Sequence, residues 1–214
     1  MKIISLEAGP LATRFYLIHT DASNYAVLID APLDCAEKTM YHLEKHNLEL
    51  RIILLTHSHW DHFAGAPKLK ELTGAAIAVH TLDEYRLLDP MKHSIVPLDF
   101  ELSPIKPDVY LQEEMDILFA DYSCFQVLST PGHTEGSVCF VEKNKKVIFT
   151  GDTLFKNSVG RYDFPGGNYE DLKNSIKNKI LTLPDDFTIY PGHGMKTTIA
   201  DEKKYNPFIR FELD

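Results

Sequence analysis

Residues 56–65 carry the side chains whose types and spacing are best suited to chemistry. They read T-H-S-H-W-D-H-F-A-G and place three histidines and an aspartate directly after an apolar run. Three later fragments each add one metal-type side chain behind an expected strand, because T-P-G-H ends in His133, F-T-G-D in Asp152 and Y-P-G-H in His193. Imidazoles and carboxylates that meet at one point are the donor set of a transition-metal site.

The seven side chains fall into two ligand sets and a bridge between them. The first set consists of the imidazoles of His57, His59 and His133. The second set adds a carboxylate and consists of Asp61, His62 and His193. Asp152 is the natural bridge, because one carboxylate can place an oxygen on each of two ions. For this division the chain must turn out of its strand at once, with Asp61 and His62 on the first turn of a helix.

This donor set predicts metal-assisted hydrolysis. Two divalent ions about 3.5–4 Å apart can share a hydroxide, since coordination lowers the pKa of water from about 15.7 towards about 7. The same ions can polarise a carbonyl and stabilise the oxyanion that develops on attack. Neutral imidazoles and carboxylates suit zinc, iron or manganese, and we expect zinc. We expect Asp61 and Asp152 to be catalytic as well as ligands.

Each of these residues also has a structural interpretation. Asp61 could be the N-cap of the helix that follows it, and Asp152 could be a turn residue after Gly151. A lone histidine is more often structural than a ligand, and we expect this of His19, His42, His46, His80 and His93. The complete H-x-H-x-D-H cluster is far more specific than any single position.

Composition limits the class of protein and its partners. A chain of 214 residues can bury one full hydrophobic core, so we expect a single domain over residues 1–214. A formal net charge of -9 argues against a nucleic-acid partner. The three cysteines show no C-x-x-C spacing, which is typical of core packing in a reducing compartment. Residues 1–10 are unlike a signal peptide and no apolar run is of membrane-spanning length, so we expect a cytoplasmic location with no membrane partner. The oligomeric state is not indicated.

Strand-like and helix-like segments alternate irregularly in two roughly matching halves. Expected strands lie at residues 2–6, 13–19, 25–29, 51–55, 75–79, 116–119, 125–129, 138–141, 147–149 and 187–189. Two helices are expected at residues 36–47 and 67–73. A third, short helix is expected to begin at a capping box formed by Thr81 and Glu84 and to end before Pro90. A fourth is expected to begin at Asn168 and extend through Ile180, and a last one to begin near Glu202. Residues 142–146 read as a solvated hairpin loop. Residues 89–107 hold four prolines and read as a long loop, either a lid or a passive excursion. Two packed sheets with helices outside are the layer arrangement that this pattern suggests.

In these motifs the chain resembles the metallo-β-lactamase fold superfamily, and within it the glyoxalase II-like hydrolases. The matching stretches appear in the family's order over nearly the whole chain: T-H-S-H-W-D-H-F-A-G, T-P-G-H-T-E-G-S, F-T-G-D-T-L-F and Y-P-G-H-G-M-K-T-T. The resemblance implies an α/β fold, namely an αββα four-layer sandwich with two mixed sheets. It also implies a binuclear zinc hydrolase of thioesters, typically S-lactoylglutathione, with the seven residues above as ligands.

The substrate follows only in part from the resemblance. A thioester suits this site, because its thiolate leaving group is weakly basic and needs little help from a general acid. No dedicated general acid is evident in the sequence, which agrees with such a substrate. The chain ends at Asp214, so we expect no carboxy-terminal helical domain of the kind that supplies the glutathione pocket in longer members, and the thiol carrier stays open. Arg161, in G-R-Y-D-F-P-G-G-N, is the candidate for a substrate carboxylate contact, with a structural ion pair to Asp163 as the alternative.

Three rival functions remain. A persulfide dioxygenase resembles the chain in the same motifs and would hold one iron with His57, His133 and Asp152. The D-F-P-G-G-N stretch favours the hydrolase over it. A lactonase or β-lactamase would use the same attacking group. A non-catalytic metal-bound scaffold would be expected to have lost some of the seven polar ligands, and all are present.

Overall fold

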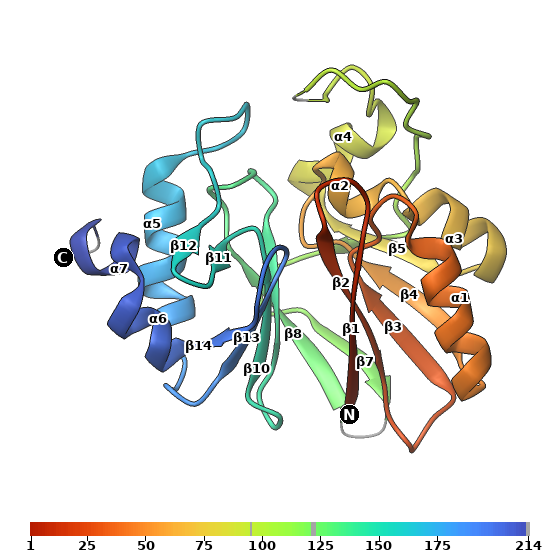
Figure 1. The fold of residues 1–214 in the computed structure, drawn as a ribbon, viewed down its shortest axis with the longest axis horizontal. Coiled ribbons are helices and arrows are strands. Elements are labelled where there is room, and N and C mark those ends of the chain that lie inside the picture. Colours follow the sequence, from red (N-terminus) through yellow and green to blue (C-terminus); the bar gives the residue numbers. More distant parts are fainter. Residues whose placement is uncertain (95, 121–122, 213–214) are drawn as a thin grey trace.

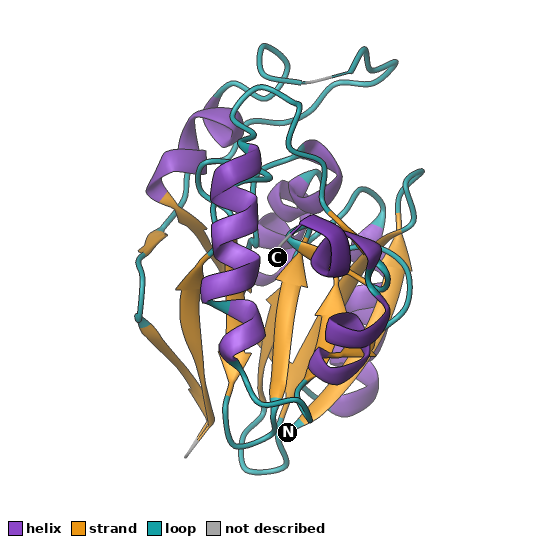
Figure 2. Cartoon of the chain, turned by 90° about the vertical axis from the view of Figure 1, so that its left-hand side faces the viewer, coloured by secondary structure: helices purple, strands orange, loops and turns teal. Residues whose placement is uncertain are grey.

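The computed structural model describes residues 1–94, 96–120 and 123–212. Two sheets of six strands each lie face to face, and helices cover their outer faces (Figure 1). The view turned by 90° shows the helices outside the strands (Figure 2). Both sheets contain parallel and antiparallel pairs. The predicted αββα four-layer fold is therefore confirmed.

The first sheet has the order β1-β2-β3-β4-β5-β6. Its strands are β1 (Lys2–Ala8), β2 (Thr13–His19), β3 (Tyr25–Ile29), β4 (Glu49–Leu54), β5 (Ala76–His80) and β6 (Val109–Leu111). The pairs from β3 to β6 are parallel. The helical segments between them are α1 (Cys35–His46), α2 (Trp60–Phe63), α3 (Ala66–Thr73), η1 (Thr81–Asp83) and α4 (Glu84–Leu88).

The second sheet has the order β14-β13-β10-β9-β8-β7. Its strands are β7 (Asp116–Ala120), β8 (Ser123–Ser129), β9 (Val138–Glu142), β10 (Val147–Gly151), β13 (Thr188–Pro191) and β14 (Thr197–Thr198). β10 and β13 pair in parallel. A small hairpin of β11 (Leu154–Phe155) and β12 (Ser158–Val159) follows β10, and the remaining helical segments are α5 (Tyr169–Asn178), η2 (Ile180–Thr182), α6 (Ile199–Tyr205) and α7 (Pro207–Glu212).

Strands that are apolar at consecutive positions contribute side chains to two hydrophobic cores, one on each face of the sheet. In β2, Phe15 and Leu17 pack with α1 and α3, whereas Tyr16 and Ile18 face the second sheet. This division follows from the two-residue period of side chains along a strand. Leu172 and Ile176 of α5 cover the outer face of the second sheet. The central strands β2, β3, β9 and β10 are thus buried on both faces, which explains why their sequences show continuous apolar runs rather than alternation.

Several local expectations were wrong. Thr81 does not cap a helix, because η1 begins there and the His80 Nδ1 accepts the Leu82 N–H at 3.3 Å. The helix expected near Glu202 begins at Ile199, where the Thr198 hydroxyl accepts the Asp201 N–H at 3.1 Å.

Two further expectations were wrong about burial or helix length. Glu142 is buried at the end of β9, where its carboxylate accepts the Lys145 N–H, rather than lying in a solvated loop. Ile180 lies in η2 beyond the end of α5. Cys35 and Cys139 are buried as expected, whereas Cys124 is partly exposed.

One edge of the sandwich collects the loops of interest. β3, β4 and β5 run parallel in the first sheet, and β8, β10 and β13 share one direction in the second. The two sheets are joined at this edge, since the Val138 N–H donates to the Thr56 carbonyl at 2.8 Å. Side chains that directly follow these strands therefore converge, as ligands do at strand ends in open α/β sheets.

None of the helices in the described ranges has the length and apolarity that crossing a bilayer requires.

Candidate metal centre

The structure brings all seven predicted ligands into one cluster at this edge. Three groups have ligand atoms that lie within 4.8 Å of one another: His57, His59 and His133; His57, His62 and Asp152; and Asp61, His62 and His193. The first and third groups are the two sets expected from the sequence. The second group joins them, because it shares His57 with one set and His62 with the other.

Asp152 lies between the two sets. Its Oδ1 is 3.2 Å from the His62 Nε2, and its Oδ2 is 3.6 Å from the His133 Nε2 and 3.5 Å from the His193 Nε2. One carboxylate thus reaches imidazoles of both sets. That is the placement a bridging ligand requires.

Local backbone geometry aims these side chains. After β4 the chain leaves the sheet, His59 is extended with φ -69° and ψ 143°, and the chain then turns into α2, which carries Asp61 and His62. Gly151 precedes Asp152 with a φ of 47°, and a Cβ at this glycine would lie 2.4 Å from the Thr56 hydroxyl oxygen. The strand end can therefore approach the H-x-H segment closely only because a glycine stands there.

Several ligand atoms are buried and lack hydrogen-bond partners. Such atoms show whether the residues fit a bound ion, because an ion would satisfy them. His57 Nε2, His62 Nε2 and Asp152 Oδ1 make no hydrogen bond of normal geometry with the described residues. A buried polar atom without a partner is costly unless something else satisfies it. His57 Nε2, His62 Nε2 and Asp152 Oδ1 belong to the cluster, and His59 turns its Nδ1 towards it, 2.8 Å from the His133 Nε2. The residues therefore fit one or more bound cations.

The other ring nitrogen of several histidines is held from outside the cluster. His62 Nδ1 lies 2.8 Å from Asp30 Oδ2, His133 Nδ1 is 2.7 Å from the Arg161 carbonyl oxygen, and His193 Nδ1 is 3.2 Å from the Leu11 carbonyl oxygen. An acceptor there fixes the proton on Nδ1 and leaves Nε2 free to coordinate. This is the usual support of a metal-binding histidine.

The pKa values of the protein alone separate the two sets. Burial lowers the pKa of His57 well below its usual value and that of His59 to about 3, so both stay neutral. Burial also opposes charge on His62, but the carboxylates around it outweigh burial and raise its pKa well above the usual value. For Asp152, His62 and His193 overcome burial and hold the pKa well below its usual range. The second set thus carries compensating charges that a cation would replace.

Asp61 does not cap α2. The N-cap residue of this helix is His59, and the Asp61 Oδ2 accepts the Thr13 hydroxyl at 2.9 Å and lies 3.3 Å from the His193 Nε2. The structure therefore places Asp61 in the cluster rather than at a helix end.

Arg161 lies beside the cluster but already has a partner. Its guanidinium forms a two-pronged ion pair with Asp163, at 2.8 and 2.7 Å, and lies 3.4 Å from the Phe164 ring centroid. The Phe164 ring in turn packs edge-on against His59 at 6.1 Å. A Cβ at Gly160 would overlap the Asp152 carbonyl oxygen at 1.6 Å, so this loop lies tightly against the bridge.

The other histidines are outside the cluster. His19, His42 and His46 stack along the first sheet and α1, and His93 packs on Tyr85 at 4.7 Å. His93 belongs to the loop of residues 89–107. That loop is anchored next to the candidate ligands by Phe100, which lies 5.5 Å from the Trp60 ring.

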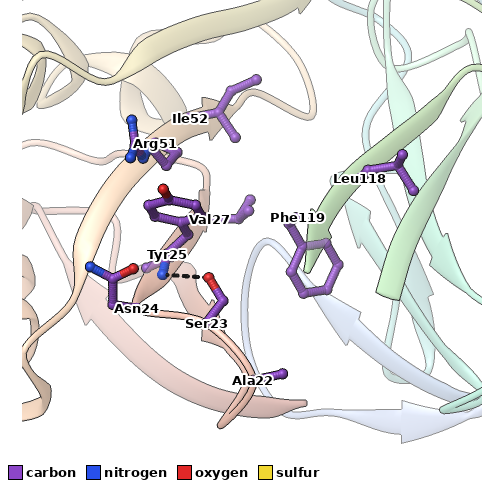
Figure 3. A pocket seen from close by; sticks show the side chains of 10 residues that line it. Ala22, Ser23, Asn24, Tyr25, Val27, Arg51, Ile52, Leu118 and Phe119 are labelled. Atoms are coloured by element: carbon purple, nitrogen blue, oxygen red, sulfur yellow. Dashed lines mark hydrogen bonds between the residues drawn. The ribbon is translucent and has the colours of Figure 1, made fainter. Parts of the chain in front are cut away.

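A separate pocket of about 630 Å³ lies at the opposite end of the strands, and Figure 3 shows the side chains that line it. Tyr25, Arg51, Leu118 and Phe119 line it, and Tyr25 is the first residue of β3 whereas the candidate ligands follow the ends of strands. This pocket is therefore remote from the metal cluster.

The sequence reasoning missed four supporting residues: Thr13, Asp30, Asp83 and Arg86. Asp30 carried a usable signal, since it directly follows the strand of residues 25–29 just as the H-x-H segment follows its own strand. The others carry no local motif.

Comparison with known proteins decides the family. Residues 8–193 match the model of the metallo-beta-lactamase superfamily. This chain belongs to that superfamily. It is 40% identical over 194 residues to a Haemophilus influenzae protein named hydroxyacylglutathione hydrolase GloC, covering 90% of this chain and 91% of the relative.

Solved structures of the superfamily agree. The crystal structure of BLEG-1 B3 metallo-beta-lactamase aligns with a TM-score of 0.88 and 33% identity, covering 97% of this chain and 99% of that one. The crystal structure of TTHA1623 in a di-iron-bound form aligns with a TM-score of 0.81 and 35% identity, covering 96% and 99%. The chain is thus a member of a metallo-hydrolase superfamily with a His/Asp cluster that could hold metal ions.

Proposed function

We propose that this protein is a metal-dependent thioesterase that hydrolyses S-lactoylglutathione or a related acyl thioester. The observation that carries the proposal is the pair of ligand sets joined by Asp152, in which buried donor atoms lack other partners. The similarity to a protein named hydroxyacylglutathione hydrolase supports the thioester. All seven residues predicted as ligands have a place in this centre.

The side chains of this centre divide the work. Two divalent ions, zinc in our proposal, would act as Lewis acids towards a substrate carbonyl and a water molecule. His57, His59 and His133 offer neutral imidazoles to one ion, and Asp61, His62 and His193 add a carboxylate for the other. Asp152 keeps the two sets together, and it and Asp61 balance the positive charge.

The leaving group needs little assistance. A thiolate is a weak base, so its departure does not require a strong general acid. We propose that Arg161 contacts a substrate carboxylate, exchanging Asp163 for it, because a guanidinium binds carboxylates in two-pronged geometry and this one is half exposed. The guanidinium packs on the Phe164 ring, which contacts His59, and this supports a position of Arg161 next to the cluster. We also propose a cytoplasmic location and a small-molecule rather than macromolecular substrate.

The decisive experiment is a substrate panel on protein reconstituted separately with zinc, iron and manganese. We expect hydrolysis of S-lactoylglutathione or another acyl thioester to exceed hydrolysis of lactones and β-lactams. Oxygen uptake with glutathione persulfide, at one iron per chain, would instead establish the dioxygenase. Metal binding without turnover of any substrate would establish a scaffold.

Asp152→Ala tests the bridge directly. We expect thioesterase activity to fall more than about 100-fold, since even residues that only support a ligand contribute about 10–100-fold. Asp21→Ala, which removes an exposed carboxylate that pairs with Lys2 away from the cluster, is the control and should retain its metal and its activity. Thioesterase activity that survives Asp152→Ala with full metal content would show that Asp152 does not bridge.

A further inference from the structure

A buried carboxylate outside both ligand sets contacts the segments that carry one of them. Asp83 ends η1 and is fully buried. Its Oδ2 accepts the Ser58 N–H at 2.7 Å and the Thr134 hydroxyl at 2.9 Å. Its Oδ1 accepts the Gly136 N–H at 2.9 Å and the Arg86 Nη1 at 3.1 Å. Four donors occupy about all the acceptor positions of a carboxylate.

Three of the four donors, all except Arg86, come from the two segments that hold the three-imidazole set. Ser58 stands between His57 and His59, and Thr134 directly follows His133. These segments are far apart in the sequence, and Asp83 is bonded to both. The carboxylate therefore sets the spacing between the H-x-H segment and the T-P-G-H loop.

Arg86 extends this link to a third segment. Besides Asp83, its guanidinium donates to the Glu135 Oε2 at 2.7 Å and to the Pro165 carbonyl at 3.0 Å. Pro165 lies in the loop whose Arg161 carbonyl accepts from His133. A Cβ at Gly136 would lie 2.7 Å from the Asp83 carboxylate, so the loop fits against Asp83 only with a glycine there.

A stabilising role alone is a weak explanation of this arrangement. Burying an ion pair such as Asp83–Arg86 costs desolvation that the attraction between the charges often only offsets. What the pair does provide is a fixed geometry, because every polar atom of the carboxylate is used. Its bonds reach the backbone beside the ligands of one set.

We infer that Asp83, held by Arg86, is the positioning residue of the three-histidine site formed by His57, His59 and His133. It keeps the three imidazoles in place before a cation binds, and it does not itself touch the cation. This inference rests on the proposed metal centre but not on the identity of the substrate.

Asp83→Asn tests it by metal binding. The asparagine has nearly the same shape, but its amide group presents N–H donors to a site built from donors, so at least one of Ser58, Gly136 and Arg86 loses its acceptor. We expect the affinity of one of the two ions to fall by about 10–100-fold while the other is unchanged. Titration of the metal-free protein with Co²⁺, followed by visible absorption and by chelator competition, measures both affinities.

Reference variants assign the weakened site. His59→Ala removes a ligand of the three-histidine set, and His193→Ala removes one of the other set. The absorption spectrum of the single tight Co²⁺ ion in Asp83→Asn should match that of His59→Ala. Asp108→Asn is the control, because Asp108 also accepts a backbone N–H, from Ile77 at 2.8 Å, and pairs with a cation, Lys70, but contacts no ligand segment. It should bind both ions as the unsubstituted protein does.

Thr134→Val keeps the test valid if Asp83→Asn does not fold. It removes one of the four donors and retains the shape, so we expect the same ion to weaken, by less than about tenfold. Equal weakening of both ions, a match to His193→Ala, or unchanged binding in the folded variants would overturn the inference.

The outcomes also separate this inference from the proposed function. If the protein binds two ions and Asp83→Asn loses one selectively but no thioester is hydrolysed, the function is wrong and the role of Asp83 stands. If the unsubstituted protein binds no cation, both are wrong.

Discussion

Asp30→Asn is the substitution that best probes how the second ligand set is oriented. Asp30 is buried directly after β3. Its Oδ1 accepts the Thr56 N–H at 2.8 Å, and its Oδ2 accepts the Thr56 hydroxyl at 2.9 Å and lies 2.8 Å from the His62 Nδ1. Because a carboxylate only accepts, the proton of the neutral His62 ring must lie on Nδ1, which leaves Nε2 free to bind a cation.

The amide of asparagine cannot satisfy all these donors. If its oxygen keeps the Thr56 N–H, its NH₂ group faces the His62 Nδ1, and the ring must move its proton to Nε2. That tautomer blocks the donor atom. If the amide turns over, its NH₂ group opposes the Thr56 N–H instead. The backbone is not at issue, since asparagine tolerates the φ of 59° found here.

The magnitude follows from one lost buried hydrogen bond. An unsatisfied buried donor costs about 1–3 kcal/mol. At about 1.4 kcal/mol per tenfold, the affinity for the second ion should fall by about 5–150-fold, which agrees with the effect of losing a partner of a ligating histidine. The Thr56 hydroxyl, 3.1 Å from the His57 Nδ1, can still donate to the remaining amide oxygen, so the first ion should be little affected.

Chelator competition on the metal-free protein, reloaded with zinc, measures the affinities of both ions. Asp21→Asn is the matched control, because Asp21 is an exposed aspartate that pairs with Lys2 far from the cluster. Asp30→Asn protein that folds normally and binds both ions with unchanged affinity would refute the argument from the tautomer of His62.

Three other outcomes are expected. Arg161→Ala should raise KM about tenfold for a thioester that bears a carboxylate, with little change in kcat or in the KM of an uncharged thioester, as steady-state kinetics would reveal. Phe149→Ala should lower the free energy of unfolding by about 3–5 kcal/mol in denaturant titrations, because this fully buried ring packs on Tyr16 and Tyr190. Burial lowers the pKa of His193, but hydrogen bonds to Asp152 and Asp61 outweigh it and raise the pKa to about 9. A cation must therefore displace a proton from this ring below that pH, so zinc affinity should increase with pH up to about 9. Calorimetry at pH 7 in buffers of different ionisation enthalpy should detect the release of this proton. A zinc affinity that does not depend on pH would contradict this prediction.

Much of the fold was predictable because its strands are continuous apolar segments. The bounds of β2 and β3 agree with the sequence expectation, and those of β4, β9 and β10 differ by one or two residues. The two-residue strands β11, β12 and β14 could not be found, since they are too short to show a period. The capping box at Thr81 failed because the neighbouring His80 side chain takes the role of N-cap.

The candidate ligands were predictable for a related reason. Each ligand motif directly follows an apolar strand, so the sequence alone indicates that its side chains meet at one edge of the sandwich. Whether they bind ions, and which, stays a prediction, as do the single-domain organisation and the identity of the substrate. The placement of Asp152 between the two sets was expected from chemistry, and the structure has this placement.

The carboxylates that support the ligands, Asp30 and Asp83, were harder to predict from the sequence. The backbone of the ligand segment explains why they are needed and why no local motif marks them. β4 ends at Leu54, so the segment that aims His57 and His59 has left the sheet. Its buried N–H groups therefore lack strand partners and must find other acceptors. Asp30 takes the Thr56 N–H and Asp83 takes the Ser58 N–H, one residue before and one after His57. Both acceptors lie just beyond the strands that flank β4, since Asp30 directly follows β3 and Asp83 ends η1, which follows β5. Both are remote from this segment in the sequence. A ligand segment that leaves its sheet thus requires buried acceptors from the adjacent strand ends, and acidic residues just beyond those strands are the place to look for them.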